Sequence, residues 1–282
     1  MLYIILLFFV IYIALGIYPL FINKKLPKIT HSVINKDMPI PKIIHRTWHD
    51  LNVNKKMIEK AHDPWVKLNP DFTIKWYNLE DCREFMKNFD LRAYKAWEKL
   101  KPLAFKSDLW RLCKLYNEGG VYVDADSKPF YSIDTMTKDH WNKGYNQFMA
   151  AHELEIKFIE CTGVHNGFII STPKHPFLKA CIDKIIENVE NERYFKCDTE
   201  YSGPYLLFEQ LSNITGNKPK AGYNVNKNPE LNYYLFKYAY EQIFDGYKRI
   251  LKKKYDFFHS TFYKKIIKNN WSKMSRNKDI YH

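Results

Sequence analysis

The sequence lacks the short signatures of several common enzyme classes. It has no glycine-rich phosphate-binding loop, no G-x-S-x-G nucleophile elbow and no catalytic-cysteine signature. It also contains no internal repeat. Its few cysteines are widely spaced without a C-x-x-C pair, which argues against a zinc cluster or a disulfide scaffold and favours buried or free thiols; they are Cys82, Cys113, Cys161, Cys181 and Cys197.

The composition is that of a folded protein with an excess of positive charge. Of the 282 residues, 46% are hydrophobic and 17% aromatic, enough to bury a core. The length suits a membrane anchor followed by one catalytic domain. The formal charge of +13 implies an anionic partner. Charge alone does not choose among nucleic acid, an acidic membrane surface and a substrate that carries a diphosphate.

The N-terminal segment is uncharged and apolar. Residues 1–22 contain no charged side chain. This uncharged segment is long enough for a bilayer span, which needs about 20 residues. We predict a transmembrane anchor at residues 1–23. A cleaved signal peptide is the alternative, but its apolar part is usually about 7 to 15 residues long and follows a basic segment. Residues 24–40 are predicted to be a linker, and residues 41–282 the catalytic domain.

Helical and extended patterns alternate along the rest of the chain, which predicts an α/β fold with a mixed sheet. Strands are expected at residues 41–48, 73–77, 121–123, 146–151 and 167–171. Helices are expected at residues 57–69, 79–89, 102–118, 176–189 and 204–212, the third of them stopped by Gly119-Gly120.

Two carboxylates follow the expected strand at residues 121–123. In an extended chain Asp124 and Asp126 would point to the same side, where the strand ends. Such a pair suits Mg²⁺ or Mn²⁺, which can bridge protein oxygens to a diphosphate. Upstream, Asp108 and Arg111 lie three residues apart on one helix face, a spacing that an ordinary surface ion pair also has.

A longer pattern joins these residues and closely resembles the DXD sugar-binding region of glycosyltransferase family 32. That family includes fungal α-1,6-mannosyltransferases and inositol-phosphoceramide mannosyltransferases, and its core resembles the glucosylating clostridial toxins. The pattern A-x-x-S-D-x-x-R-x-x-x-L-Y-x-x-G-G-x-Y-x-D-x-D is filled by Ala104, Ser107, Asp108, Arg111, Leu115, Tyr116, Gly119, Gly120, Tyr122, Asp124 and Asp126.

The resemblance continues on both sides of this pattern. Residues 40–48 (IPKIIHRTW) look like the family's first strand, while residues 166–177 and Ser202-Gly203-Pro204 are also similar. It therefore covers most of residues 41–211. It implies a GT-A-type nucleotide-sugar-binding fold, a GDP- or UDP-hexose donor, Mn²⁺ or Mg²⁺, transfer with retention of configuration, and a glycan, glycolipid or protein acceptor.

The resemblance also implies roles for single residues. Asp126 would bind the metal directly, Asp124 would contact the donor ribose or sugar and the metal through water, and Asp108 and Arg111 would hold the donor sugar. Trp48 would lie near the nucleotide base, although a core tryptophan is the alternative. The family carries a histidine followed by a Ser-Trp pair that closes over the diphosphate; His259 matches, whereas the later pair here reads Trp271-Ser272. Lysines near this end could serve the diphosphate or form a solvated face: Lys264, Lys265 and Lys268.

Two other functions remain as alternatives. A phosphotransferase of the haloacid-dehalogenase type also places DxD after a strand. Its motif has Thr or Val two residues after the second Asp, where this chain has Lys128. A membrane-tethered protein that binds lipid or nucleic acid through its basic C-terminal face is the non-enzymatic alternative.

The sequence gives conflicting indications of membrane topology. Lys24, Lys25 and Lys28 follow the apolar segment and would favour a cytoplasmic domain, whereas the family resemblance suggests a Golgi-type lumenal one. We favour the lumenal side, because long domains translocate largely regardless of flanking charge. Two N-x-S/T sequons begin at Asn213 and Asn270.

Overall fold

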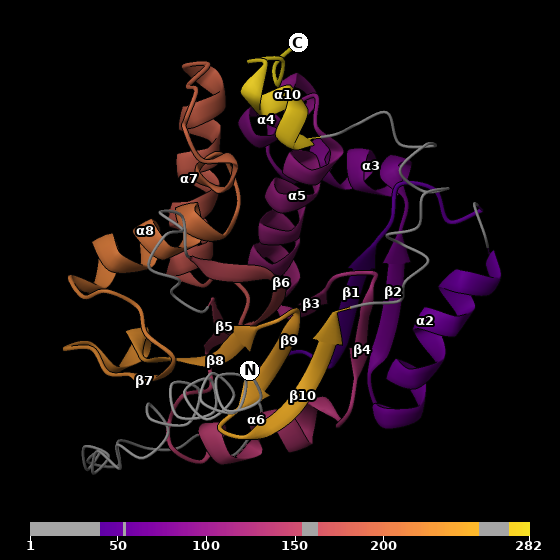
Figure 1. The fold of residues 1–282 in the computed structure, drawn as a ribbon, viewed down its shortest axis with the longest axis vertical. Coiled ribbons are helices and arrows are strands. Elements are labelled where there is room, and N and C mark those ends of the chain that lie inside the picture. The colour runs from indigo at the N-terminus through magenta and orange to yellow at the C-terminus, as the bar shows by residue number, and fades with distance from the viewer. Residues whose placement is uncertain (1–39, 53–54, 154–162, 254–270) are drawn as a thin grey trace, which may run out of the picture. The chain divides into compact units, whose positions relative to one another are not determined.

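The computed structural model describes residues 40–52, 55–153, 163–253 and 271–282 (Figure 1). These residues belong to one compact unit, Asn35–His282. Within the described part of the chain, no helix has the length and apolar character that a bilayer span requires. The predicted anchor at residues 1–23 lies outside the described residues, so the anchor and the domain boundaries stay predictions.

One mixed sheet organises the described residues, as the alternating pattern predicts. Ten strands of these residues join it, in the order β2-β1-β3-β6-β5-β8-β9-β10-β4, with β7 paired to β8. Strands β1, β2 and β3 run parallel, β5 pairs with β8 in parallel, and the remaining pairs are antiparallel. The strands are β1 (Ile43–Thr47), β2 (Thr73–Tyr77), β3 (Gly120–Val123), β4 (Ser127–Pro129), β5 (Phe148–Glu153), β6 (Val164–Ser171), β7 (Gly222–Asn224), β8 (Tyr233–Ala239), β9 (Gln242–Asp245) and β10 (Lys248–Lys253).

The sheet curls so that its last strand returns to its third. Strands β3 and β4 are separated by six steps in the strand order, which in a flat sheet would be about 29 Å at about 4.8 Å a step. Yet only residues 124–126 join them, and the four residue steps from Val123 to Ser127 span at most about 14 Å. A flat sheet is therefore impossible. The Asp124-Ala125-Asp126 link closes the curl.

The helices pack mainly around α5, which carries the first half of the family pattern. Helix α5 contacts α3, α4 and α7, and Figure 1 shows these helices grouped on one side of the strands. Helix α2 instead contacts β2 and β4. The helices are α2 (Lys55–Leu68), α3 (Leu79–Phe89), α4 (Leu91–Lys99), α5 (Leu103–Glu118), α6 (Ile133–Trp141), α7 (Pro176–Glu190), α8 (Pro204–Thr215) and α10 (Trp271–Arg276), with short 3₁₀ turns at η2 (Asp198–Glu200) and η3 (Pro229–Leu231).

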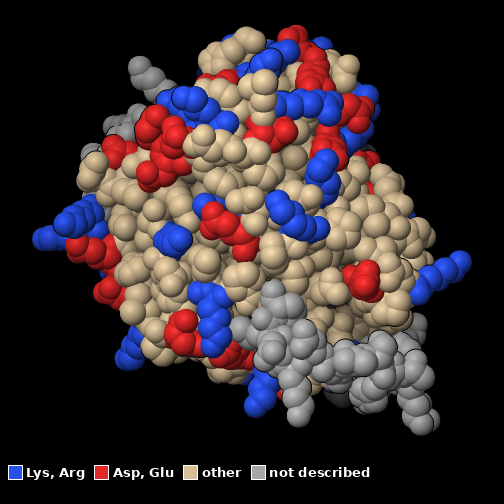
Figure 2. All heavy atoms as spheres, turned by 180° about the vertical axis from the view of Figure 1, so that it is seen from behind, with Lys and Arg blue, Asp and Glu red and all other residues tan. Residues whose placement is uncertain are grey.

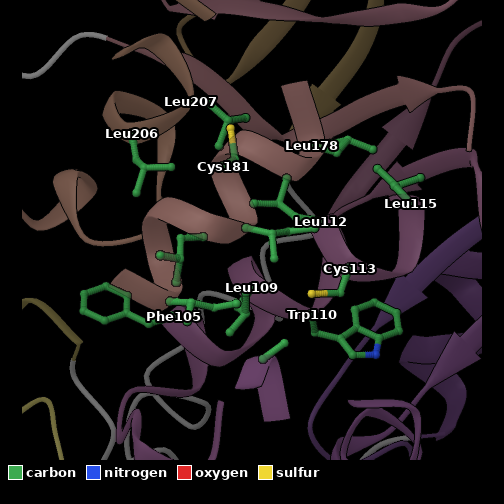
Figure 3. Close-up of a cluster of buried hydrophobic side chains, with 14 of the residues drawn as sticks. Phe105, Leu109, Trp110, Leu112, Cys113, Leu115, Leu178, Cys181, Leu206 and Leu207 are labelled. Atoms are coloured by element: carbon green, nitrogen blue, oxygen red, sulfur yellow. The ribbon is translucent and has the colours of Figure 1, made fainter. Parts of the chain in front are cut away.

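The main hydrophobic core lies where α5 meets α7 and α8. Figure 3 shows Leu109 and Leu112 of α5 directed at the same cluster as Leu178 of α7 and Leu207 of α8. All four side chains are at most 1% exposed. Burial of such a side chain stabilises a fold by about 1.5–3 kcal/mol. This packing fixes α5, and with it the polar side chains that α5 carries.

The Gly119-Gly120 pair ends α5 and starts β3. Gly119 caps the helix with φ +67°, and Gly120 follows with φ +94°. A Cβ on Gly120 would lie 2.6 Å from the carbonyl oxygen of Ile43, so no side chain fits between β3 and β1 there. The helix stop predicted from the sequence is confirmed.

The ten strands and helices predicted from the sequence are present, with bounds shifted by at most three residues. Helices α4, α6 and α10 and strands β4 and β7 to β10 were not predicted from the sequence. Cys82, Cys113 and Cys181 are buried free thiols, as expected. Cys197 is disulfide-bonded, so the expectation of free thiols is wrong for this residue; cysteines that meet only through the fold leave no spacing signature.

Candidate active site

Asp124 and Asp126 sit in a tight turn between β3 and β4. The amide of Ser127 donates to the carbonyl of Asp124 over 3.1 Å, which closes a four-residue turn with Ala125 and Asp126 at its centre. The amide of Asp124 itself donates to the carbonyl of Gly167 over 3.0 Å. The expectation of two carboxylates on one side of an extended strand is therefore wrong, because the strand ends at Val123 and the curl of the sheet bends the chain there.

The guanidinium of Arg111 connects α5 to this turn. Its Nη2 lies 3.1 Å from Asp108 Oδ1, and its Nη1 lies 3.4 Å from Asp124 Oδ1. Nη1 also donates to the carbonyl of Asn166 over 2.9 Å. The arginine side chain is 8% exposed and lies over the Tyr122 ring at 4.5 Å from its centroid. The pair Asp108 and Arg111 is thus part of a buried network and is not a surface ion pair.

Asp108 is held by three neighbours and has a perturbed pKa. Its Oδ1 accepts a hydrogen bond from Asn166 over 2.9 Å, and its Oδ2 accepts one from Ser202 over 2.8 Å. Burial raises the pKa of this carboxyl from 3.8 to about 6, although Arg111 and the Ser202 hydroxyl oppose the rise. A perturbed carboxyl with converging polar partners is typical of a functional site.

Asp124 is held as a carboxylate by two cations. Its Oδ1 accepts from the Tyr122 hydroxyl over 3.1 Å, and its Oδ2 lies 3.5 Å from Lys253 Nζ. Burial works against ionisation, but Arg111 and Lys253 outweigh it and hold the pKa of Asp124 below its usual range. Gly167 leaves the room for this arrangement, since a Cβ there would lie 2.3 Å from Asp124 Oδ2.

Asp126 shares the electrostatic environment of Asp124. It is 6% exposed. Burial lowers the pKa of Lys253, but Asp124 and then Asp126 outweigh it and raise that pKa above its usual value. Carboxylate oxygens are the ligands that Mg²⁺ and Mn²⁺ prefer. The described residues contain no cluster of three or more His, Cys, Asp or Glu side chains suited to a metal ion. The two turn carboxylates therefore fit an ion that takes its other ligands from water and from a substrate diphosphate.

Trp48 lies beside the turn. It follows β1, is half-buried, and packs against the cluster formed by Ala61 and Ala125, the central residue of the D-A-D motif. Its amide donates to the carbonyl of Tyr77 over 3.0 Å. The structure thus brings Trp48 to the site without burying it in the main core.

Of the site residues predicted near the C-terminus, Trp271 lies in the described part of the chain. His259 and the lysines Lys264, Lys265 and Lys268 lie outside the described residues. Trp271 begins α10, is 41% exposed, and its ring lies 6.3 Å from that of Phe105 on α5. Phe105 stacks on Tyr201, the neighbour of Ser202, at 5.2 Å. Trp271 is therefore connected to the Asp108 side of the site through aromatic contacts, and the structure records no contact of it with the D-A-D turn.

Three side chains of the site were not assigned roles from the sequence: Asn166, Ser202 and Lys253. Asn166 and Ser202 lie in stretches that resemble the family, and this similarity was the available signal. Lys253 is the last residue of β10 and pairs with Ser127 of β4. It belongs to a run of three lysines, so no sequence pattern separates it from a solvated basic stretch. Only the curl of the sheet brings it to Asp124.

Comparison with known proteins agrees with this geometry. The family model described as "glycosyltransferase sugar-binding region containing DXD motif" matches residues 22–148. This part of the chain is similar to that family. The resemblance to glycosyltransferase family 32 is thereby confirmed. Proteins with this DXD region use a nucleotide-sugar donor and typically a divalent metal.

Curated relatives of this glycosyltransferase come from a virus and from fungi. An uncharacterised glycosyltransferase of Acanthamoeba polyphaga mimivirus is 27% identical over 183 residues, which cover 64% of this chain and 68% of that protein. Inositol phosphoceramide mannosyltransferase 3 of Schizosaccharomyces pombe is 27% identical over 61% of this chain, and the match spans only 45% of that protein. A mannosyl phosphorylinositol ceramide synthase of Saccharomyces cerevisiae is 26% identical over 52% of this chain and 35% of its own length. This chain thus spans less than half of these two fungal proteins.

Among solved structures, the PaToxG glycosyltransferase is similar over 63% of this chain and 70% of that chain. The identity is 20% and the TM-score 0.47.

The perturbed pKa of Asp108 predicts a pH-dependent stability difference. The folded-state pKa of Asp108, about 6, lies above the unfolded value of 3.8. The contribution of this carboxyl to the stability of the fold is therefore greatest below pH 3.8 and is lost as the pH rises through about 6. The wild-type protein should therefore lose up to about 3 kcal/mol relative to Asp108→Asn between about pH 4 and pH 7. Urea unfolding across this range measures the difference. Asp139→Asn, at an exposed position of α6, controls for the removal of one charge. If the free energy of unfolding of wild type rose relative to that of Asp108→Asn as the pH increases, the raised pKa of a buried Asp108 carboxyl would be contradicted.

Proposed function

We propose that this chain is a retaining, divalent-metal-dependent glycosyltransferase that moves a hexose from a nucleotide sugar to a glycan, glycolipid or protein acceptor. The observation that carries the proposal is the junction of Arg111 with Asp108 on α5 and with Asp124 in the D-A-D turn. One guanidinium thus couples a sugar-holding group to a metal-holding turn. The GT-A-type fold is part of the same proposal, and the mixed sheet supports it.

The metal would be held by the D-A-D turn. Asp126 is the direct ligand in this proposal, and Asp124 contributes through water or through contact with the donor. A divalent ion there supplies charge stabilisation to the departing nucleoside diphosphate. Lys253, 3.5 Å from Asp124, adds a fixed positive charge on the same side.

Asp108 and Arg111 are suited to hold the hydroxyl groups of the donor sugar. Their own contacts to Asn166 and Ser202 fix both side chains before a ligand arrives. Such preorganisation lowers the cost of orienting a substrate. Trp48, half-buried beside Ala125, offers a flat face to the nucleotide base, because stacking needs no particular base-edge pattern.

The donor nucleotide and sugar belong to the GDP- or UDP-hexoses. The names of the fungal relatives refer to mannosyl transfer onto inositol phosphoceramides, which supports GDP-mannose as the first donor to test. A hydrolysis assay with Mn²⁺ over a panel of nucleotide sugars separates the three functions considered. Only a glycosyltransferase releases free sugar and nucleoside diphosphate, whereas a dehalogenase-type phosphotransferase and a non-enzymatic binding protein do not.

Two structural observations bear on the alternatives. Arg111 joins Asp108 and Asp124 in one buried network, which supports an active site over a degenerate one. The basic stretch proposed for lipid or nucleic acid lies largely at residues 254–270, outside the described part. On the face seen in Figure 2, basic and acidic side chains of the described residues are interspersed.

For localisation, we propose a single-pass membrane protein with a lumenal catalytic domain. The disulfide at Cys197 supports this side of the membrane, because disulfides persist in oxidising compartments. Asn213 of the first sequon is exposed in the last turns of α8 and can therefore accept a glycan without unfolding the helix core. Its neighbour sequon at Asn270 lies outside the described residues.

The metal assignment predicts that Asp126→Ala abolishes turnover and leaves the fold intact. A single electrostatic group at an active site is typically worth about 10²-fold or more in rate. Nucleotide-sugar hydrolysis at saturating Mn²⁺ and a melting curve measure the two properties. Asp139→Ala, at an exposed position of α6, is the matched control and should keep full activity. A rate for Asp126→Ala above about a tenth of wild type would refute the metal assignment.

Retention of configuration is tested on the product. Proton NMR of the first-formed glycoside from an α-linked donor should show an α-linkage. A β-linkage would show that transfer inverts, and the mechanistic part of the proposal would be wrong even if the transferase activity stands.

The lumenal topology predicts glycosylation of Asn213 in a eukaryotic host. Endoglycosidase treatment should shift the mobility of the wild-type protein and of Asn270→Gln, but not that of Asn213→Gln. The absence of a shift for Asn213→Gln tests the expectation that Asn270, next to Trp271, stays unmodified. No shift in any of the three, together with protease sensitivity of the domain in sealed microsomes, would place the domain on the cytoplasmic side.

A further inference from the structure

Arg46 is buried directly behind the D-A-D turn. It lies in β1 and is 0% exposed. Its Nη2 donates to the carbonyl of Ala125 over 2.7 Å and approaches those of Asp124 and Ser127 at 3.3 and 3.4 Å. Its Nη1 donates to the carbonyl of Ala61 in α2 over 2.6 Å. One guanidinium therefore joins three main-chain carbonyls of the turn to a helix.

Aromatic rings enclose this guanidinium. Its central carbon lies 4.3 Å from the centroid of the Trp76 ring and 5.7 Å from that of Trp65. The indole nitrogen of Trp65 donates to the carbonyl of Ser127 over 3.0 Å, so two donors converge on the same end of the turn. Hydrogen bonds to a charged donor away from water are stronger than those at the surface.

These contacts act on the backbone from which both carboxylates project. The described turn has one main-chain hydrogen bond of its own, from Ser127 to Asp124. The directions of the Asp124 and Asp126 side chains depend on the dihedral angles of this turn. A cation behind it also lowers the cost of holding two carboxylates close together. In metal sites, residues that do not bind the metal commonly orient its ligands through hydrogen bonds to the ligand side chains. Arg46 instead holds the backbone of the turn that carries the ligands.

We propose that Arg46 is a positioning residue, which orients the D-A-D turn so that its carboxylates bind the divalent ion. This inference rests on the metal-dependent function proposed above. Arg46 touches neither the ion nor the donor in this proposal, and it acts only through the carbonyls of residues 124, 125 and 127. Because a guanidinium fork makes several hydrogen bonds in fixed directions, lysine is no substitute for it.

The test compares Arg46→Lys with Arg92→Lys in the full chain. Arg92 of α4 forms an exposed ion pair with Glu190 at the end of α7 and serves as the matched control. The dissociation constant for Mn²⁺ alone is measured from the EPR signal of the free ion, and melting curves are recorded in parallel. Arg46→Lys should weaken Mn²⁺ binding about 10- to 100-fold, whereas Arg92→Lys should bind as wild type does.

Kinetics distinguish positioning from a merely structural role. In nucleotide-sugar hydrolysis, Arg46→Lys should need correspondingly more Mn²⁺ for half-maximal rate, and excess Mn²⁺ should recover part of that rate. If Arg46→Lys is less stable yet binds Mn²⁺ as tightly as wild type, the proposal is overturned. If Arg46→Lys does not fold, Arg46→Gln, which keeps one amide donor, takes its place. Failure of both to fold would assign Arg46 to stability and overturn the positioning role.

The metal-dependent function and the role of Arg46 are contradicted by different results. If wild type and Arg92→Lys bind Mn²⁺ and Arg46→Lys binds it equally, only the role of Arg46 is wrong. If wild type itself binds no Mn²⁺, the metal-dependent function is wrong and the role of Arg46 is overturned with it.

Discussion

The Arg111 guanidinium lies between two carboxylates that come from different parts of the chain, and the rest of the site is arranged around it. It contacts Asp108 on its own helix and Asp124 in the D-A-D turn. Leaving either carboxylate buried without this cation would be costly. Asn166 and Ser202 complete the contacts of Asp108, while Tyr122 and Lys253 complete those of Asp124. Helix α5 therefore has to be held rigidly, and the core around Leu109 and Leu112 does this.

The same network gives its two carboxyls different character. Burial dominates at Asp108 and raises its pKa to about 6, whereas two cations dominate at Asp124 and lower its pKa. The two groups are both linked to one guanidinium, yet only Asp124 is held firmly as an anion. A carboxylate that stays ionised suits a metal-binding turn, and a carboxyl with a higher pKa suits hydrogen bonding to neutral hydroxyl groups.

The sequence was sufficient to predict α5, the Gly119-Gly120 stop, β3 and the four charged residues Asp108, Arg111, Asp124 and Asp126, because they follow each other without gaps. Helix periodicity also placed α3 and α7. The β8–β10 meander could not be predicted, since β8 (YYLFKYA) is mostly aromatic, β10 (KRILKK) is mostly basic, and neither alternates cleanly between apolar and polar residues. Lys253 was missed for the same reason. The turn at Asp124 was misread as extended chain, because the curl of the sheet is a property of ten strands together and leaves no local signal.

The three-residue link between β3 and β4 also limits how this sequence can change. Ser127 is in register with Lys253, and Val123 is in register with Phe168. An inserted residue between Val123 and Ser127 would shift β4 by one position and turn its side chains to the opposite face. A deletion would shift β4 by one position in the other direction, with the same inversion of its side chains. The length of the D-A-D motif is therefore set by strand register as well as by ligand chemistry, so this stretch tolerates substitution at Ala125 more readily than any change of length.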